Sequence, residues 1–240
     1  MKPQYVFFLF LLISCQKPKP ALQIASVLPK AKIAMVTKEN SLRTDTIILS
    51  EDKNAEVTHI LIYLTEQKPD KDSIIESKFR LDFYHNKEKI ASSKVKITGY
   101  EKGSEWSGSY GLTPSEGISS FIKIDFGYPA CGYTFENYLY YLKNNNLQLV
   151  HEWQSMSDSG WGTWTEFINE DSNKHPELFY CKTVSFEPAD DDSEDSGILK
   201  YSDSTSFLLK GNHWKKQLLS TKDKPYFEKK MNLNDFYKQD

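Results

Sequence analysis

The feature that most constrains the fold is the alternation of apolar with polar residues over short stretches of the chain. Within residues 120–126, the apolar side chains of Ile122, Ile124 and Phe126 occupy every second position. Residues 147–154 alternate in the same way. A period of two places these side chains on one face of an extended chain, so each stretch is predicted to be a strand with one buried face.

Other short stretches rich in β-branched and aromatic residues occur along most of the chain. They are residues 32–37, 46–50, 57–64, 79–84, 89–98, 138–142, 178–186, 198–201, 206–209 and 213–219. About a dozen short strands with almost no helical periodicity predict an all-β fold. We expect a mainly antiparallel β-sandwich or barrel, and two packed β subdomains are an alternative.

Several connections can be predicted from their turn residues. Residues 85–88 and the asparagines at 144–146 are expected to form hairpin turns, because asparagine tolerates the left-handed backbone conformation that tight turns require. Residues 68–77 are predicted to be a helical turn or a polar loop, and residues 232–237 a helical turn. The glycine-rich segment 99–117 is the expected boundary if residues 31–240 form two units rather than one body.

The first residues have the pattern of a secretory signal. Residues 1–14 contain one lysine and then an unbroken apolar run at 5–13, which is too short to span a bilayer as a helix. The run ends in Leu12 and Ile13, and Ser14 and Cys15 follow it. This ending resembles the lipobox of bacterial lipoproteins, in which a leucine stands three positions before an acceptor cysteine that follows a small residue.

The resemblance covers only the start of the chain, and it implies lipidation of Cys15 after removal of residues 1–14. An ordinary cleaved signal with an incidental cysteine is the alternative. Residues 15–30 then form the lipidated cysteine and a flexible, proline-containing spacer. Gln16 is not the aspartate that resembles an inner-membrane retention signal in enteric bacteria, which favours the outer membrane. The sequence leaves open whether the protein faces the periplasm or the cell surface.

Charge and hydropathy exclude some classes of partner. The net charge is −3, and the lysines and arginines are scattered among acidic residues, which argues against nucleic acid as a partner. The signal is the one long apolar run, so membrane attachment is expected through the N-terminal lipid alone. We therefore expect an envelope protein or a glycan as the other partner.

The two remaining cysteines, Cys131 and Cys181, are predicted to form a disulfide, because an even pair in an oxidising compartment is more often bonded than catalytic. The bridge would close a loop of about 50 residues and add on the order of 4 kcal/mol to the stability. Cys131 as a nucleophile is the alternative, but no histidine is tied to it by a recognisable pattern.

A candidate ligand site is the segment 155–164, which is predicted to be a polar loop. Trp161 and Trp164 could stack on sugar rings there, while Asp158 accepts hydrogen bonds from hydroxyl groups. The interpretation we favour is a glycine-rich turn whose tryptophans fold back onto the core, because large aromatic side chains are on average highly buried.

The acidic run at 190–195 overlaps a candidate calcium-binding loop. Asp192, Glu194, Ser196 and Asp203 stand at positions one, three, five and twelve of a calcium loop. The twelfth position prefers glutamate, and no helical pattern flanks the segment. We favour a solvated acidic loop and expect no cofactor, with weak calcium binding as the alternative.

Motifs of the common catalytic classes are missing. The sequence has no HExxH zinc motif, no GxSxG serine elbow and no phosphate-binding glycine loop. The sequence thus predicts a lipid-anchored envelope protein that acts in binding or surface architecture rather than as an enzyme. A glycan-binding module using Trp161 and Trp164 is one alternative, and a carbohydrate-active hydrolase with a carboxylate pair is another.

Overall fold

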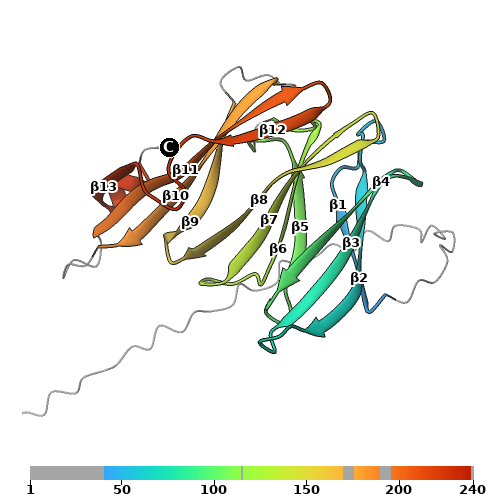
Figure 1. Cartoon of the computed structure of the whole chain (residues 1–240), viewed down its shortest axis with the longest axis horizontal. Coiled ribbons are helices and arrows are strands. Elements are labelled where there is room, and N and C mark those ends of the chain that lie inside the picture. The colour runs from blue at the N-terminus through green and yellow to red at the C-terminus, as the bar shows by residue number, and fades with distance from the viewer. Residues whose placement is uncertain (1–40, 115, 170–175, 190–195, 239–240) are drawn as a thin grey trace, which may run out of the picture. The chain divides into compact units, whose positions relative to one another are not determined.

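The structure, a computed structural model, describes residues 41–114, 116–169, 176–189 and 196–238. The predicted strand at 32–37, the signal, Cys15 and the spacer lie outside these residues. Two antiparallel sheets account for almost all of the described chain, as Figure 1 shows. The prediction of an all-β, antiparallel fold is therefore confirmed.

The smaller sheet contains the first four strands in chain order. They are β1 (Arg43–Ile48), β2 (His59–Pro69), β3 (Ile75–His85) and β4 (Glu88–Thr98). The predicted hairpin at 85–88 is confirmed, and Asn86 has the positive φ of 52° that its tight turn requires. Residues 68–77 do not form a helical turn, because β2 and β3 continue into this segment from both sides. Asp70 Oδ1 closes the turn by accepting from the backbone N–H of Asp72 and Ile74.

The larger sheet has nine strands. They are β5 (Glu105–Tyr110), β6 (Phe121–Gly127), β7 (Thr134–Lys143), β8 (Asn146–Asp158), β9 (Trp161–Ile168), β10 (Leu178–Pro188), β11 (Ser196–Lys210), β12 (His213–Leu218) and β13 (Phe227–Asn232). The strands from β5 to β12 are neighbours in chain order, and within the described residues the sheet does not close into a barrel. The glycine-rich segment 99–117 contributes β5, which pairs with β6.

Two of the predicted strands are parts of one longer strand. Residues 198–201 and 206–209 belong to one strand, β11, which is interrupted by a bulge where Asp203 has a φ of 49°. One edge of β11 pairs with β10. The other edge pairs first with β13 and then with β12. The asparagine hairpin between β7 and β8 is confirmed, with positive φ at both Asn144 and Asn145.

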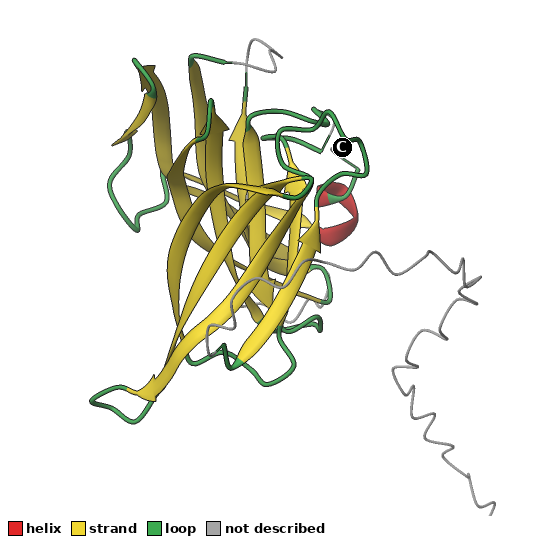
Figure 2. Cartoon of the chain, turned by 90° about the vertical axis from the view of Figure 1, so that its right-hand side faces the viewer, coloured by secondary structure: helices red, strands yellow, loops and turns green. Residues whose placement is uncertain are grey.

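The main core lies between the smaller sheet and strands β5, β6 and β7 of the larger one. Side chains from both sheets are fully buried there, including Ile62, Phe79, Ile124 and Tyr140. Phe79 packs against Trp106 and Phe126, with ring centroids 5.2 and 5.5 Å apart. Figures 1 and 2 show the smaller sheet facing these strands, so this half of the body is a sandwich.

A second core forms on the other face of the larger sheet, where the sheet curves back on itself. Trp214 of β12 packs against Phe121 of β6 and Phe179 of β10, with ring centroids 5.4 and 4.8 Å apart. The side-chain amide of Gln148 on β8 pairs with the Trp214 backbone. It donates to the carbonyl at 2.9 Å and accepts from the N–H at 2.8 Å. These contacts cover one face of β8–β11. The other face is available only in part, because Val184, Phe186 and Leu199 form a smaller third core there, packed against Trp161, Met231 and Phe236.

The described chain ends in a single helical turn, α1 (Leu233–Phe236), as predicted. The Asn232 side chain caps it by accepting from the backbone N–H of Asn234 at 2.8 Å. No helix among the described residues is long and apolar enough to cross a membrane.

Candidate functional site

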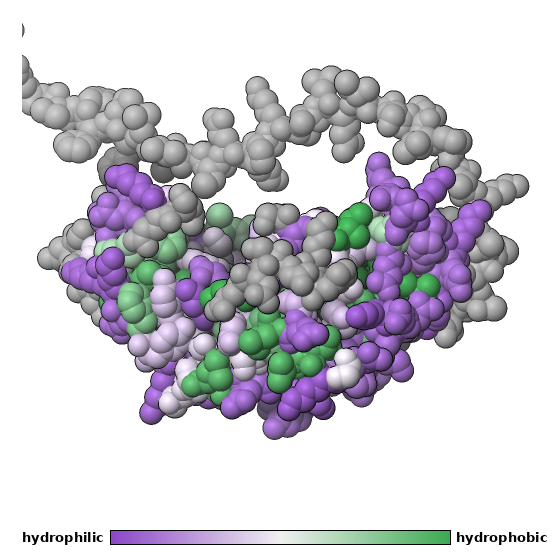
Figure 3. Space-filling view, turned by 90° about the horizontal axis from the view of Figure 1, so that it is seen from above, coloured by the Kyte–Doolittle hydropathy of each residue, from purple (hydrophilic) through white to green (hydrophobic). Residues whose placement is uncertain are grey.

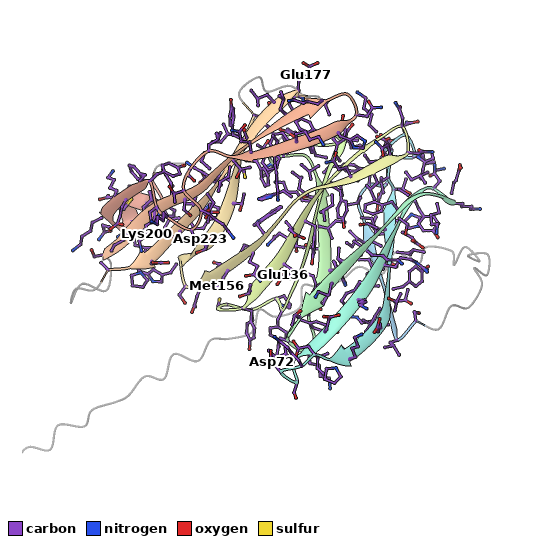
Figure 4. All side chains as sticks on the ribbon, viewed as in Figure 1. Asp72, Glu136, Met156, Glu177, Lys200 and Asp223 are labelled. Atoms are coloured by element: carbon purple, nitrogen blue, oxygen red, sulfur yellow. The ribbon has the colours of Figure 1, made fainter. Side chains whose placement is uncertain are left out.

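A groove of about 890 Å³ lies over the available face of β8–β11, between α1 and the loop that joins β6 to β7. Met156 of β8, labelled in Figure 4, is on its rim. The lining comprises Pro129, Ala130, Cys131, Phe135, Ser155, Met156, Ser157, Thr163, Trp164, Glu166, Val184, Leu199, Tyr201, Phe236 and Tyr237. The groove is thus built from segments far apart in the sequence, and it has the size of a small-ligand site.

The segment 155–164 is not the polar loop that its composition predicts. It is the end of β8, a tight turn at Ser159 and Gly160, and the start of β9. Gly162 allows this close pairing, because a Cβ there would lie 2.2 Å from the Met156 carbonyl oxygen. Serines, aspartates and glycines conceal the alternation in this hairpin, but the hairpin is what positions Trp164.

The floor of the groove follows from the register of three strands. Trp164 of β9 is opposite Val184 of β10, and Val184 is opposite Tyr201 of β11. Residues paired across antiparallel strands share a face, so these three side chains form one apolar row. Leu199 extends the row on β11.

The two tryptophans of the hairpin have different environments. Trp164 lines the groove and is half-buried. The Trp161 ring instead covers Gly197 and packs on Phe186, with ring centroids 4.9 Å apart. A Cβ on Gly197 would lie 2.4 Å from the Trp161 ring, so the ring fills the space that a side chain would occupy. Both tryptophans are half-buried and pack against the cluster of Val184, Phe186 and Leu199, and of the two only Trp164 lines the groove.

Helix α1 supplies the end wall. Phe236 stacks on Phe186 with ring centroids 4.4 Å apart, and its edge faces Trp164 at 5.8 Å. The Tyr237 hydroxyl donates to the Gly160 carbonyl at 3.0 Å, which fixes the wall to the β8–β9 turn. Sequence reasoning missed Tyr201, Phe236 and Tyr237 as site residues. The one available signal in the sequence was the aromatic pair Phe236 and Tyr237 at the end of the predicted helical turn.

The polar groups of the groove are hydroxyls and one ion pair. Ser155, Ser157 and Thr163 are on its β8 and β9 side. Glu166 Oε2 lies 3.1 Å from Lys182 Nζ, and that ammonium group lies over the Tyr201 ring at 3.7 Å from its centroid. A cation over an aromatic face is attracted by the ring quadrupole, so the Lys182 ammonium contacts both the Glu166 carboxylate and the Tyr201 ring.

The loop before β7 places Cys131 on the rim and Asp158 close to it. The Gly132 backbone N–H donates to the Ser157 carbonyl at 2.9 Å, and Gly132 has a φ of 80°. Asp158 ends β8 beside this loop, where its Oδ1 accepts from the Ser159 hydroxyl at 3.1 Å. Asp158 is not part of the groove lining, whereas Cys131 is.

The predicted disulfide is wrong, because Cys131 and Cys181 are both free. Cys131 is exposed at the groove, while Cys181 points to the second core on the other face of β10. There its sulfur lies 3.8 Å from His151 Nε2, and burial raises the pKa of the Cys181 thiol to about 12. Such a thiol is a poor nucleophile.

The predicted calcium ligands are only partly within the described residues. Asp192 and Glu194 lie outside them. Ser196 and Asp203 are both on β11, roughly 20 Å apart at about 3.3 Å per residue. One ion cannot contact both. Among the described residues, no group of three or more histidines, cysteines and acids is arranged to hold a metal ion.

The hydrolase alternative needs two carboxyl groups in one groove, about 5 to 10 Å apart. Among the described residues that line the groove, Glu166 is the one acid, and it is paired with Lys182. The groove therefore presents an aromatic, hydroxyl-rich surface without the carboxylate pair.

No protein-family model, no curated protein and no solved structure matches the chain. What the groove does must therefore be inferred from its own residues. Its apolar row, aromatic end wall and few polar groups are the kinds of side chain that line small-ligand sites.

Proposed function

We propose that this is a lipid-anchored, non-enzymatic binding protein of the bacterial cell envelope, and that the groove over β8–β11 is its ligand site. The observation that carries this proposal is the row of Trp164, Val184 and Tyr201 that lines the groove, in which Trp164 and Tyr201 are half-buried on either side of the buried Val184. Large aromatic side chains at the surface of a concave site contribute contact area at a low entropy cost.

The anchor is supported by the residues before the spacer. The apolar run at 5–13 and the lipobox-like ending at Cys15 favour acylation of that cysteine. One acyl chain binds a membrane only marginally, at roughly 0.8 kcal/mol per methylene, so a durable anchor needs two or three chains. The residue after the cysteine, Gln16, favours the outer membrane as the destination.

Intact mass and membrane partition of the native protein test the anchor, with Cys15→Ala as the matched variant. We expect an acylated wild-type protein in the membrane fraction and an unmodified variant that leaves it. An unmodified wild-type protein in the soluble fraction would reject the lipid anchor. That result would leave the groove unaffected, because no described residue depends on Cys15.

A glycan is the ligand class that the groove favours. The flat faces of pyranose rings stack on aromatic side chains, and Trp164 is the large ring on the groove floor that can take this role. The Tyr201 ring borders the groove but already contacts the Lys182 ammonium and stacks on Phe227. Sugar hydroxyls need partners that both donate and accept, which Ser155, Ser157 and Thr163 provide, together with the Glu166 carboxylate as an acceptor. The volume of about 890 Å³ is in the range of small-molecule sites.

Tryptophan fluorescence during titration with cellohexaose, chitohexaose, mannohexaose and xylohexaose tests this ligand class. We expect at least one of these oligosaccharides to bind the wild-type protein and to bind Trp164→Ala at least tenfold more weakly. Trp153→Ala is the matched control, because Trp153 is also half-buried but packs on the other face of the sheet against Phe167. Equal loss in both variants would contradict the assignment of the groove.

A further inference from the structure

The β11–β12 hairpin carries a concentration of positive charge that the groove does not use. Between Asp203 and Asp223 the sequence contains Lys210, Lys215, Lys216 and Lys222 and no acidic residue. The first three are on the hairpin itself, and all three are exposed. Acid-free stretches with several lysines also occur at residues 1–38 and 89–100, so the charge alone does not distinguish this hairpin.

Exposed leucines lie among these lysines. Leu178 of β10 is opposite Leu208 of β11, and Leu208 is opposite Lys215 of β12. Leu178 and Leu208 are 38% and 41% exposed, and Leu219, just after β12, is 53% exposed. Solvated sheet faces usually carry polar residues, so three leucines left this open require an explanation.

These side chains form one surface with a shallow hollow of about 420 Å³. Its lining is Leu178, Tyr180, Ser206, Leu208, Lys210, Lys215, Lys216, Gln217 and Leu219, and it includes no acidic residue. We call this set the hairpin surface. Among the described residues, two acids lie beside it. The Glu177 carbonyl accepts from the Leu209 N–H at 2.8 Å, and Glu152 lines a neighbouring hollow together with Lys215 and Lys216.

We propose that the hairpin surface docks onto an anionic phospholipid bilayer. Lysine ammonium groups are attracted to lipid phosphates, and leucine side chains fit the boundary between headgroups and acyl chains. A row of leucines flanked by three lysines matches that boundary in both charge and polarity. An acidic protein partner would match the lysines but would not account for aliphatic side chains exposed among them.

The docking gives the anchored protein a preferred orientation, which the anchor alone does not supply. In sequence, 28 positions separate Cys15 from Arg43 at the start of β1, which sets an upper limit of about 95 Å at ~3.4 Å per residue on the distance between them. In Figure 4, Glu177 beside the hairpin surface lies at one end of the body, and Asp72 of the β2–β3 turn lies at the other. Figure 3 views the first end directly and shows hydrophobic side chains exposed among hydrophilic ones.

The test uses the full chain on vesicles, with an environment-sensitive dye on a single cysteine. Cys131→Ser removes the exposed native thiol, and the dye is placed either at Asn212→Cys in the hairpin turn or at Asp72→Cys at the opposite end. The vesicles contain phosphatidylcholine alone or phosphatidylcholine with 30% phosphatidylglycerol, and a spin-labelled lipid in each acts as the quencher. Cys181 is buried and the Cys15 sulfur is acylated in the anchored protein, so the introduced cysteine is the one that takes the dye.

We expect at least twofold stronger quenching at position 212 than at position 72 on vesicles with phosphatidylglycerol. The difference should disappear on phosphatidylcholine alone and in the triple variant Lys210→Gln, Lys215→Gln, Lys216→Gln. The matched control is Lys87→Gln, Lys94→Gln, Lys102→Gln, which removes the same charge from exposed positions elsewhere and should leave the difference intact. Equal quenching at both positions, or a difference that survives the hairpin triple variant, would overturn the proposal. Neither outcome would affect the glycan titration, because no lysine of the hairpin lines the groove.

Discussion

The two faces of strands β9 and β10 come from alternate residues of the same segments, yet one face is covered by β12 and the other lies under the groove. Phe167, Phe179 and Cys181 face the second core, where β12 returns and Trp214 covers them. Trp164 and Val184 face the other way, where Val184 is buried in a smaller core and Trp164 is only half-buried, against the Phe236 side chain of a single helical turn. A strand pattern thus shows which residues share a face. It does not show which face the rest of the chain covers, and the face covered only in part is the candidate site.

Removing an aromatic ring from each face should have unequal effects on stability. Phe179 is fully buried and stacks on Phe207, with ring centroids 4.5 Å apart. We expect Phe179→Ala to lower the free energy of unfolding by about 3–5 kcal/mol, and Trp164→Ala to lower it by about half as much. Urea unfolding of both variants measures this. An equal loss would mean that the groove face is as tightly packed as the core.

The covered face should also make stability depend on pH through His151. Burial lowers the pKa of His151 to about 4, with a smaller contribution from Lys216, and its Nδ1 is buried without a hydrogen-bond partner. The unfolded chain, with a histidine pKa near 6.5, binds a proton that the folded protein excludes. This contribution is fully present above about pH 6.5 and is lost as the pH falls toward 4.

We expect the loss between pH 7.5 and 4.5 to be about 1–2 kcal/mol, since the side chain is only partly buried. Urea midpoints of the wild-type protein and His151→Gln at both pH values isolate it, because His59, whose pKa is also lowered by burial, is unchanged in the variant. The variant should lose less stability on acidification than the wild type. Parallel losses would show that His151 is not buried in solution.

The two cysteines report on the two faces chemically. At pH 8 we expect iodoacetamide to modify Cys131 at least about tenfold faster than Cys181, because Cys131 is exposed and burial raises the pKa of Cys181. Peptide mass spectrometry after timed quenching measures both rates, and unfolding in urea should equalise them. Recovery of a peptide in which the two cysteines are bonded would restore the disulfide prediction.

The smallest effect is expected at the ion pair of the groove. The Glu166 side chain is 43% exposed, so Glu166→Gln should change the free energy of unfolding by less than about 1 kcal/mol. Its effect on oligosaccharide affinity should be smaller than that of Trp164→Ala, because stacking provides most of the contact. A larger loss in Glu166→Gln would indicate a ligand recognised mainly by charge.

Most of the fold was predictable from the sequence, because alternation and turn residues act locally. The strands around Ile124 and Phe79 and the asparagine hairpin all follow from patterns within about ten residues. The β8–β9 hairpin was missed, since its polar residues hide the period of two. The disulfide prediction was wrong because it rested on compartment alone, and the sequence does not show that Cys131 and Cys181 lie on opposite faces of the sheet.

The site was less predictable than the fold, because its parts are brought together only by the register of the sheet. Trp164 was recognisable as a candidate by residue type. Tyr201 enters the groove because Val184 pairs with it across β10 and β11, and Phe236 enters because α1 folds back onto Phe186. Neither contact can be predicted from a local sequence pattern.

The central claim is that the face carrying Trp164 is the ligand site, and the protein's five tryptophans allow a direct test. Each indole N–H gives one resonance in a proton–nitrogen correlation spectrum, and single Trp→Phe variants assign them. We predict that addition of an oligosaccharide that binds, from the panel of four hexasaccharides, shifts the Trp164 resonance most. The resonances of Trp106, Trp153 and Trp214, which pack in the other two cores, should stay in place. If no hexasaccharide moves the Trp164 resonance, or if Trp153 moves while Trp164 does not, the account of the groove is contradicted.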